Sequence, residues 1–218
     1  MNRIILVRHG ETDANTMGCF LGDLDADLST DPNKLAAIKN MALALEKWEN
    51  PIKVIICSPA KRAQQTAKII NDILNIDIVI EPNIREISFG SWEGKTSQEV
   101  GADELTKWKM RNPDPNTGPT NGETLKSIGD RVENVLNKLC QDYENCTIIL
   151  VTHVYVIKAA LDRAMNLSDG YHSNRLWLDT ATATIIDWNL NPEKRIVHRT
   201  NWSPCVEYSM NKWTKMNN

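Results

Sequence analysis

Two of the four histidines in this sequence end similar apolar runs, IILVRHG at residues 4–10 and IILVTHV at residues 148–154. Continuous apolar runs of this length are typical of strands that are buried on both faces. An imidazole can act as a nucleophile near neutral pH, and an arginine such as Arg8 can bind an anion beside it. We therefore expect the two strands to carry His9 and His153 to two sides of one phosphate site.

Polar residues from a third segment are expected at the same place. Ser58 and Arg62 follow the apolar run KVIIC at 53–57, and ligands of α/β folds bind beyond the carboxyl ends of the strands. Arg62 falls in the first turn of the expected helix, where the helix dipole disfavours a cation unless an anion is bound there. A solvated arginine on an exposed helix face would fit this position equally well. Gly10 has no Cβ, so we expect it to allow a sharp turn that brings the polar residues before it to one pocket.

The elements that must position these residues alternate along the chain. The expected strands span residues 3–7, 53–57, 76–80, 147–152, 180–188 and 195–199. The expected helices span residues 31–48, a segment that begins with Ser58 as N-cap and Pro59, and residues 96–110, 125–139 and 154–165. This alternation predicts an α/β fold, a three-layer α/β/α sandwich with a mostly parallel central sheet. We expect a single domain over residues 1–218, with a variable insert rich in Gly and Pro at about 85–122.

Composition excludes several classes of function. The net charge is −3 over 218 residues, so no general attraction to nucleic acid or to a membrane surface is expected. The five cysteines show no CxxC spacing, which argues against a disulfide framework and a zinc site and favours a reducing compartment. The first residues lack the apolar core of a signal peptide, and no apolar run reaches the ~18 residues that span a bilayer. We therefore expect a cytoplasmic protein.

Six short motifs resemble one known family. In chain order they are LVRHGET (6–12), Asn15, SPAKRAQQTA (58–67), REISFGSWEG (85–94), NGET (121–124) and VTH (151–153). Together they resemble the phosphatase branch of the histidine phosphatase superfamily, also called the phosphoglycerate-mutase-like family. RHG alone would be a weak signal, but its combination with the other motifs, in the family's order over roughly residues 3–165, is specific.

The resemblance implies a mechanism that uses a phosphohistidine. His9 would attack phosphorus, which requires an unprotonated ring nitrogen. Glu86 would protonate the departing alkoxide and then take a proton from the attacking water. Arg8, Arg62 and His153 would hold the phosphoryl oxygens, and arginine suits this role because its planar fork donates parallel hydrogen bonds. The resemblance implies neither a metal nor a cofactor, because phosphoryl transfer depends mostly on positioning and charge stabilisation.

The sequence also departs from the family pattern where the substrate is expected. The family often reads GRxQG where this chain reads GCFLG at 18–22, so that Cys19 replaces an arginine and Leu21 a glutamine. Small residues usually follow the second histidine, whereas here they are Val154 and Tyr155. We expect a less polar pocket, with bulk added by Tyr155. The residues expected to bind the substrate are Arg8, Asn15, Leu21, Gly22, Arg62 and Val154.

Two other functions stay open. A cofactor-dependent phosphoglycerate mutase would share the same core, but the compact segment 85–100 lacks the longer insertion with paired arginines, for which Lys109 and Arg111 are a thin substitute. A catalytically weak phospho-ligand binding protein would not require Glu86. We therefore favour a phosphomonoester hydrolase acting on a small phosphorylated metabolite, whose identity the sequence does not give.

Further alternatives concern single residues and assembly. Glu93 competes with Glu86 as the acid, and the family pattern favours Glu86. Either histidine could be a packed core residue, and His9, His153 and Glu86 together could resemble a metal site, although nearby arginines argue against this. The late strands could form the edge of a homodimer.

Overall fold

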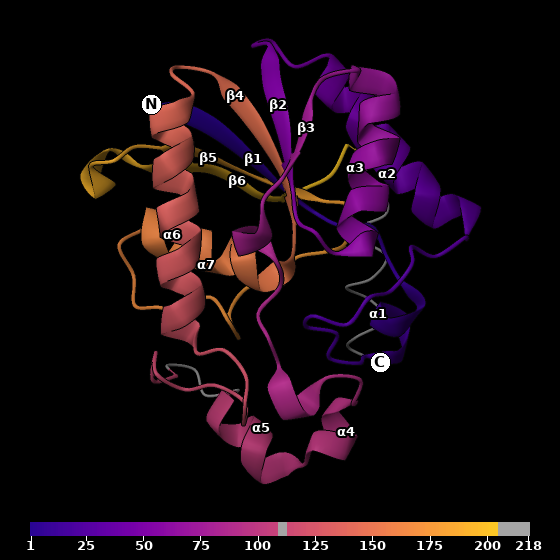
Figure 1. Ribbon diagram of the computed structural model, residues 1–218, viewed down its shortest axis with the longest axis vertical. Coiled ribbons are helices and arrows are strands. Elements are labelled where there is room, and N and C mark those ends of the chain that lie inside the picture. Colours follow the sequence, from indigo (N-terminus) through magenta and orange to yellow (C-terminus); the bar gives the residue numbers. More distant parts are fainter. Residues whose placement is uncertain (109–112, 205–218) are drawn as a thin grey trace.

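A six-stranded sheet forms the centre of the computed structural model, which describes residues 1–108 and 113–204 (Figure 1). The strand order is β3-β2-β4-β1-β5-β6, and the pairs among the first four of these are parallel, whereas β1–β5 and β5–β6 are antiparallel. The strands are β1 (Asn2–Arg8), β2 (Ile52–Cys57), β3 (Ile78–Ile80), β4 (Thr147–Thr152), β5 (Ala183–Trp188) and β6 (Ile196–Trp202). The prediction of a mostly parallel sheet is confirmed.

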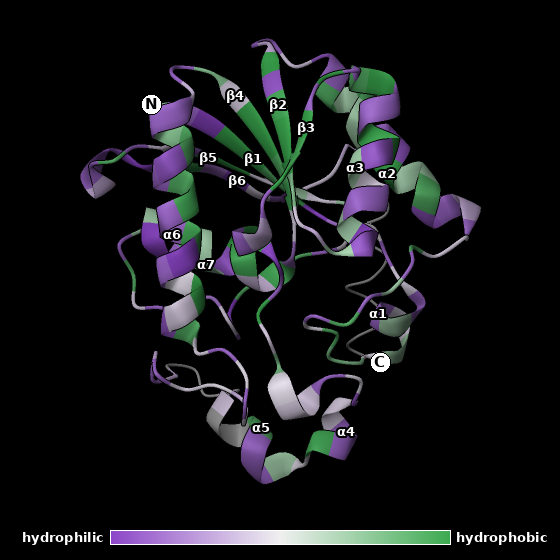
Figure 2. Ribbon diagram, in the orientation of Figure 1, coloured by the Kyte–Doolittle hydropathy of each residue, from purple (hydrophilic) through white to green (hydrophobic). Residues whose placement is uncertain are grey.

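Helices cover both faces of this sheet, α2 and α3 on one and α6 and α7 on the other (Figure 1). The α-helices are α1 (Asp13–Met17), α2 (Pro32–Glu46), α3 (Lys61–Leu74), α4 (Ser97–Val100), α5 (Ala102–Trp108), α6 (Leu125–Asp142) and α7 (Val154–Ala164). Three short 3-10 helices span Pro82–Ile84, Gly90–Trp92 and Pro192–Lys194. Successive strand residues enter different cores: Ile4 packs with α6 and α7, and Ile5 with α2 and α3. Hydrophobic strands between helices with polar outer faces (Figure 2) confirm the α/β/α sandwich.

The two similar apolar runs are neighbours in the middle of the sheet. β1 and β4 pair in parallel, with Val7 opposite Val151. One residue beyond β1, the backbone N–H of His9 donates to the carbonyl of Thr152 at 2.9 Å. Both strands therefore end together at one edge of the sheet, where His9 begins a loop and His153 is the N-cap of α7.

The helix after β2 begins later than the Ser-Pro pattern predicts. α3 begins at Lys61 with Ala60 as N-cap, so the assignment of Ser58 as the cap is wrong. The Ser58 hydroxyl instead lies 2.7 Å from Nε2 of His153. Arg62 nevertheless falls in the first turn of α3, as expected.

Other boundaries differ because of local backbone geometry. The helix expected at 96–110 is interrupted at Gly101, whose φ of 91° ends α4, and its last two residues lie outside the described part of the chain. The strand expected at 180–188 starts only at Ala183, because Ala181 has a φ of 55°. Gly10 does not have a positive φ. Its missing Cβ matters for packing instead, since an added Cβ would lie 2.4 Å from Cδ1 of Ile38.

The edges of the molecule bear on the remaining predictions. α4 and α5 lie beyond the carboxyl ends of the parallel strands, apart from the sheet (Figure 1).

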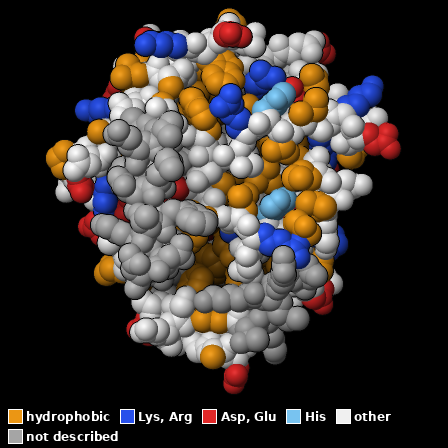
Figure 3. Space-filling model, turned by 180° about the vertical axis from the view of Figure 1, so that it is seen from behind, with side chains coloured by type: hydrophobic (Ala, Val, Ile, Leu, Met, Phe, Trp, Pro, Cys, Tyr) orange, Lys and Arg blue, Asp and Glu red, His pale blue; other side chains and the backbone are white. Residues whose placement is uncertain are grey.

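β3 and β6 are the edge strands of the sheet. The view from behind shows a band of hydrophobic side chains with Lys and Arg among them (Figure 3). Pairing of β6 with a second copy stays a prediction. Within the described ranges, no helix combines the length and apolar character needed to cross a bilayer.

Candidate active site

A small pocket of about 180 Å³ lies at the carboxyl ends of β1 and β4. Its lining residues come from the end of β1, from α1 and the loop after it, from α3, from the loop after β3 and from the first turn of α7. They are Arg8, His9, Asn15, Cys19, Phe20, Leu21, Gly22, Arg62, Glu86, Phe89, Val154 and Tyr155. Every site residue predicted from the sequence therefore lines this pocket except His153, which lies directly behind it.

The hydrogen bonding of His9 leaves one ring nitrogen unprotonated. The side chain is 3% exposed, and Nδ1 lies 2.7 Å from the carbonyl oxygen of Gly10. Because a carbonyl oxygen can only accept, Nδ1 carries the proton and Nε2 keeps its lone pair. Burial, reinforced by the charges of Arg8 and Arg62, holds the pKa of His9 well below its usual value. The imidazole is thus neutral and nucleophilic.

His153 lies next to it with a free donor. The ring is fully buried, its centroid 5.1 Å from that of His9, and Nε2 contacts the Ser58 hydroxyl. We assign the Ser58 proton to the contact with Nε2, because the other hydrogen bond of this hydroxyl among the described residues is one that it accepts, from the Ala60 N–H at 3.3 Å. Nδ1 of His153 then carries the ring proton, and this buried atom has no hydrogen-bond partner. Burial lowers the pKa of His153 as well, with a smaller contribution from His9.

Two arginines add further unused donors. Nη1 of Arg8 donates to the carbonyl of Leu178, and Arg62 donates to the carbonyls of Leu24 and Gly22 at 2.8 and 2.9 Å. These carbonyls fix the guanidinium planes without neutralising their charge. The Nε atoms of Arg8 and Arg62 are both buried and have no hydrogen-bond partner. Such donors are expensive to bury unless an acceptor occupies the site. An anion with several oxygens would satisfy them.

Glu86 is the carboxyl group of the pocket. It is 6% exposed, and its Oε1 accepts the N–H groups of Ile87 and Tyr155 at 3.0 and 3.2 Å. Burial raises the pKa of Glu86, although these hydrogen bonds and the nearby arginines oppose the shift. A raised pKa suits a proton donor. The rival carboxylate, Glu93, accepts the Phe89 N–H at 3.0 Å and does not line the pocket.

The rest of the lining is set by α1 and by aromatic packing. Oδ1 of Asn15 accepts from Thr12 within the cap of α1, which leaves its NH₂ group for a ligand. The rings of Phe20 and Phe89 lie 4.9 Å apart, and that of Tyr155 lies 5.6 Å from Phe89. The expected bulk at Tyr155 is present. Sequence reasoning missed Phe20 and Phe89, although both lie inside segments compared with the family pattern.

No metal site accompanies this arrangement in the part of the chain that the structure describes. Across residues 1–108 and 113–204, no group of three or more His, Cys, Asp or Glu side chains is placed to hold a metal ion. The alternative in which His9, His153 and Glu86 act as joint ligands therefore has no geometric support. The site instead combines a neutral imidazole, a buried carboxyl group and fixed cationic donors.

Comparisons with known proteins point to one family. A family model described as "Histidine phosphatase superfamily (branch 1)" matches residues 4–202. "Putative phosphoserine phosphatase 2" of Hydrogenobacter thermophilus is 33% identical over 153 residues, covering 68% of this chain and 72% of that protein. "Uncharacterized phosphatase PhoE" of Bacillus subtilis is 34% identical over 176 residues, covering 81% and 84%.

Solved structures show the same fold. A phosphoserine phosphatase from Entamoeba histolytica, in complex with 3-phosphoglyceric acid, has a TM-score of 0.80 at 25% identity and covers 94% of this chain and 98% of its own. A mycobacterial glucosyl-3-phosphoglycerate phosphatase has a TM-score of 0.79 at 22% identity, covering 92% and 99%. The expected architecture is thereby confirmed.

Proposed function

Because the chain belongs to the histidine phosphatase superfamily, branch 1, we propose that it hydrolyses phosphomonoesters of small metabolites through a phosphohistidine at His9. One observation carries the proposal. His9, whose Nε2 keeps its lone pair, lines a pocket together with Arg8 and Arg62, and His153 packs against it; one buried nitrogen of each of Arg8, Arg62 and His153 has no hydrogen-bond partner. A phosphoryl group supplies both an electrophilic phosphorus for His9 and hydrogen-bond acceptors for these three nitrogens.

The first step transfers the phosphoryl group to the enzyme. The Nε2 lone pair of His9 forms a bond to phosphorus while the bond from phosphorus to the ester oxygen breaks. The departing alkoxide takes the proton of Glu86, whose raised pKa favours the protonated form. Arg8, Arg62 and His153 hold the three remaining phosphoryl oxygens as their charge redistributes.

The second step returns His9 to its starting state. Glu86, now a carboxylate, takes a proton from water, and the resulting oxygen nucleophile attacks phosphorus. The bond between phosphorus and Nε2 breaks, inorganic phosphate leaves, and the lone pair returns to the ring. In this proposal the fixed cations provide the charge stabilisation, and the enzyme is independent of metals and cofactors.

Glu86 also favours this function over that of a phospho-ligand binding protein. A binding site would gain nothing from a buried carboxyl group beside a phosphate, since the negative charges repel. The mutase gains no specific support from the structure. Lys109 and Arg111, the thin substitute for paired arginines, lie outside the described residues. The homodimer and the cytoplasmic location remain predictions.

Hydrolysis of p-nitrophenyl phosphate in the presence of a chelator tests the proposal. Wild-type protein is expected to turn over and to yield an acid-labile phosphoenzyme on rapid quenching, and His9→Ala to lose about 10³-fold or more in kcat. His198→Ala is the matched control, because this imidazole bonds Asp187 away from the pocket. Activity only with a bisphosphoglycerate primer would identify a mutase, and turnover abolished by chelation would refute metal independence. No turnover of any ester would identify a binding protein.

A further inference from the structure

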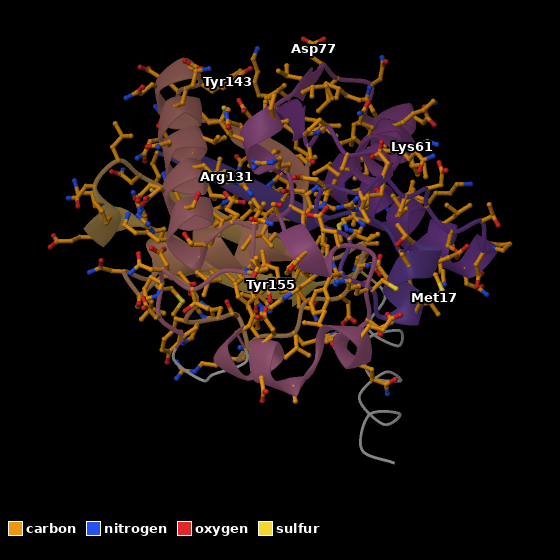
Figure 4. The ribbon with its side chains drawn as sticks, turned by 60° about the horizontal axis from the view of Figure 1, so that its bottom comes forward. Met17, Lys61, Asp77, Arg131, Tyr143 and Tyr155 are labelled. Atoms are coloured by element: carbon orange, nitrogen blue, oxygen red, sulfur yellow. The ribbon has the colours of Figure 1, made fainter. Side chains whose placement is uncertain are left out.

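A second and larger cavity, of about 530 Å³, adjoins the catalytic pocket. The two share the side chains of Arg8, Val154 and Tyr155 in their walls. Tyr155 lies in the middle of the molecule, on the side that faces α4 and α5 (Figure 4). Ligand sites for small molecules typically have volumes of about 300–1,000 Å³, so the larger cavity has room for a substrate body that the catalytic pocket lacks.

The position of Glu86 shows which part of a substrate would enter this cavity. Its carboxylate is held by the N–H of Tyr155 in the first turn of α7. The ester oxygen that leaves must lie beside this carboxyl group, because it receives the proton there. The alcohol therefore departs on the side of Val154 and Tyr155. We call the cavity beyond them the leaving-group cavity.

The charged side chains that line the leaving-group cavity, among the described residues, are basic. Its lining includes the basic side chains of Arg8, Lys158 and Arg175, together with Ser173, Asn174 and Trp177. No Asp or Glu is found among the described residues that line it. The guanidinium carbon of Arg175 lies 3.8 Å from the ring centroid of Tyr171, which helps to position that cation. A neutral leaving group would not require such a lining.

Lys158 is the most constrained of these cations. It is 8% exposed on the buried side of α7, and Nζ donates to the carbonyl of Ser173 at 2.6 Å. Nζ also lies 5.3 Å from the ring centroid of Tyr155. Neither partner carries a charge that would neutralise the ammonium group, and burying such a charge is costly without an anionic partner.

Burial lowers the pKa of Lys158 most, and the charge of Arg8 lowers it further, whereas the charges of Glu86 and Asp162 raise it. Asp162 is already occupied, since its carboxylate accepts the N–H of Gly170 and contacts Nδ1 of His172. Within the described chain, no carboxylate forms an ion pair with Lys158. Lys158 can therefore bind an anion that enters the leaving-group cavity.

We propose that the leaving-group cavity selects phosphate esters whose alcohol carries a second anionic group, either a carboxylate or a second phosphate. Lys158 and Arg175 would bind that group while Arg8 spans both cavities. This inference rests on the proposed function, since it assigns the substrate class of the same site. It adds a specificity site that the catalytic set of His9, Glu86 and His153 does not include.

Matched esters test the inference. Phosphoglycolate is compared with ethyl phosphate, in which a methyl group replaces the carboxylate, and propanediol bisphosphate with propyl phosphate. In at least one pair, we expect kcat/KM to be about tenfold or more higher for the ester that carries the second anionic group. This is the ratio that one favourable charge pair supplies. A preference in the first pair alone identifies a carboxylate as the second anion, and in the second pair alone a phosphate.

Variants assign the preference to the cavity. Within each ester pair, the ratio compared is kcat/KM with the second anionic group to kcat/KM without it. Arg175→Gln and Lys158→Met are each expected to lower this ratio by about fivefold or more. Arg199→Gln on β6, an exposed arginine outside both cavities, is expected to keep the wild-type ratio. Lys158 is buried, so thermal unfolding of its variant checks the fold, and the partly exposed Arg175 provides the independent test.

Binding separates failure of this inference from failure of the proposed function. Calorimetry with phosphonoacetate and ethylphosphonate makes the same comparison without turnover. If phosphonoacetate binds more tightly and Arg175→Gln abolishes the difference, the result supports the leaving-group cavity even when no ester is hydrolysed. Equal values within each ester pair, or a preference that survives both variants, would overturn the inference. Continued His9-dependent hydrolysis of ethyl phosphate would leave the proposed function intact.

Discussion

The replacement Glu86→Gln should separate the two proton transfers of the proposed mechanism. A glutamine has the same shape, and its carbonyl oxygen can still accept the N–H groups of Ile87 and Tyr155 that bond Oε1 in the native protein. The fold should therefore be unchanged, while the side chain can neither give nor take a proton. KM for an alkyl phosphate should change little, because the protonated Glu86 and the glutamine that replaces it are both uncharged when the ester binds.

The size of the effect depends on the leaving group. General acid catalysis contributes about 10²–10⁴-fold, or about 3–5 kcal/mol of activation free energy. For an alkyl phosphate, whose alkoxide needs the proton, we expect kcat of Glu86→Gln to fall by this amount. A nitrophenolate leaves without a proton, so formation of the phosphoenzyme from p-nitrophenyl phosphate should slow by less than about tenfold. Hydrolysis of the phosphoenzyme should still be slow, because no carboxylate is left to take a proton from the attacking water.

Quenched-flow measurement of nitrophenol release checks this directly. Glu86→Gln is expected to release a burst close to one equivalent per enzyme, followed by slow turnover. Glu93→Gln is the matched control, since Glu93 does not line the pocket and accepts from the Ser88 hydroxyl and the Phe89 backbone N–H. Its kinetics should resemble those of the wild type. The reasoning is refuted if formation of the phosphoenzyme slows equally for alkyl and aryl esters, or if Glu93→Gln alone shows the selective loss.

Three further predictions concern stability and pH. Thr66→Val removes the hydroxyl that accepts the Gly10 N–H at 2.9 Å and should cost about 1–3 kcal/mol in urea unfolding; a cost no larger than that of Thr66→Ser would contradict this. Gly90→Ala should cost about 2–5 kcal/mol, because its φ of 51° is combined with a Cβ only 2.4 Å from a backbone oxygen. Gly18→Ala, with a φ of 73° and open space, should cost only about 1–2 kcal/mol, so equal losses would refute the packing argument. Burial lowers the pKa of Lys158 to about 8, so the ammonium is charged below that pH. The preference in kcat/KM for esters with a second anionic group should therefore decline as pH rises through about 8. A preference unchanged to pH about 10 would exclude Lys158 as its source.

The sheet and the catalytic strand ends could be predicted because burial determines both. A run such as IILV is buried on both faces only in the middle of a parallel sheet, so the residues directly after β1 and β4 had to meet at the same edge. The role of Ser58 could not be read in the same way. A serine before a proline is a good helix start, and only the position of His153 in space shows that its hydroxyl serves the imidazole instead.

The two cavities differ in how the chain encodes them. The nitrogens of the catalytic pocket follow strand ends or a helix start, positions with a clear sequence signal. Lys158 occurs within the helical segment VIKAALDR, where a lysine ordinarily extends into solvent. Its contact with the Ser173 carbonyl, fifteen residues further along the chain, is what brings it inside. Chemistry and substrate choice thus depend on separate parts of the fold. Substitutions at Lys158 or Arg175 should change which ester is preferred without disturbing the strands that hold His9.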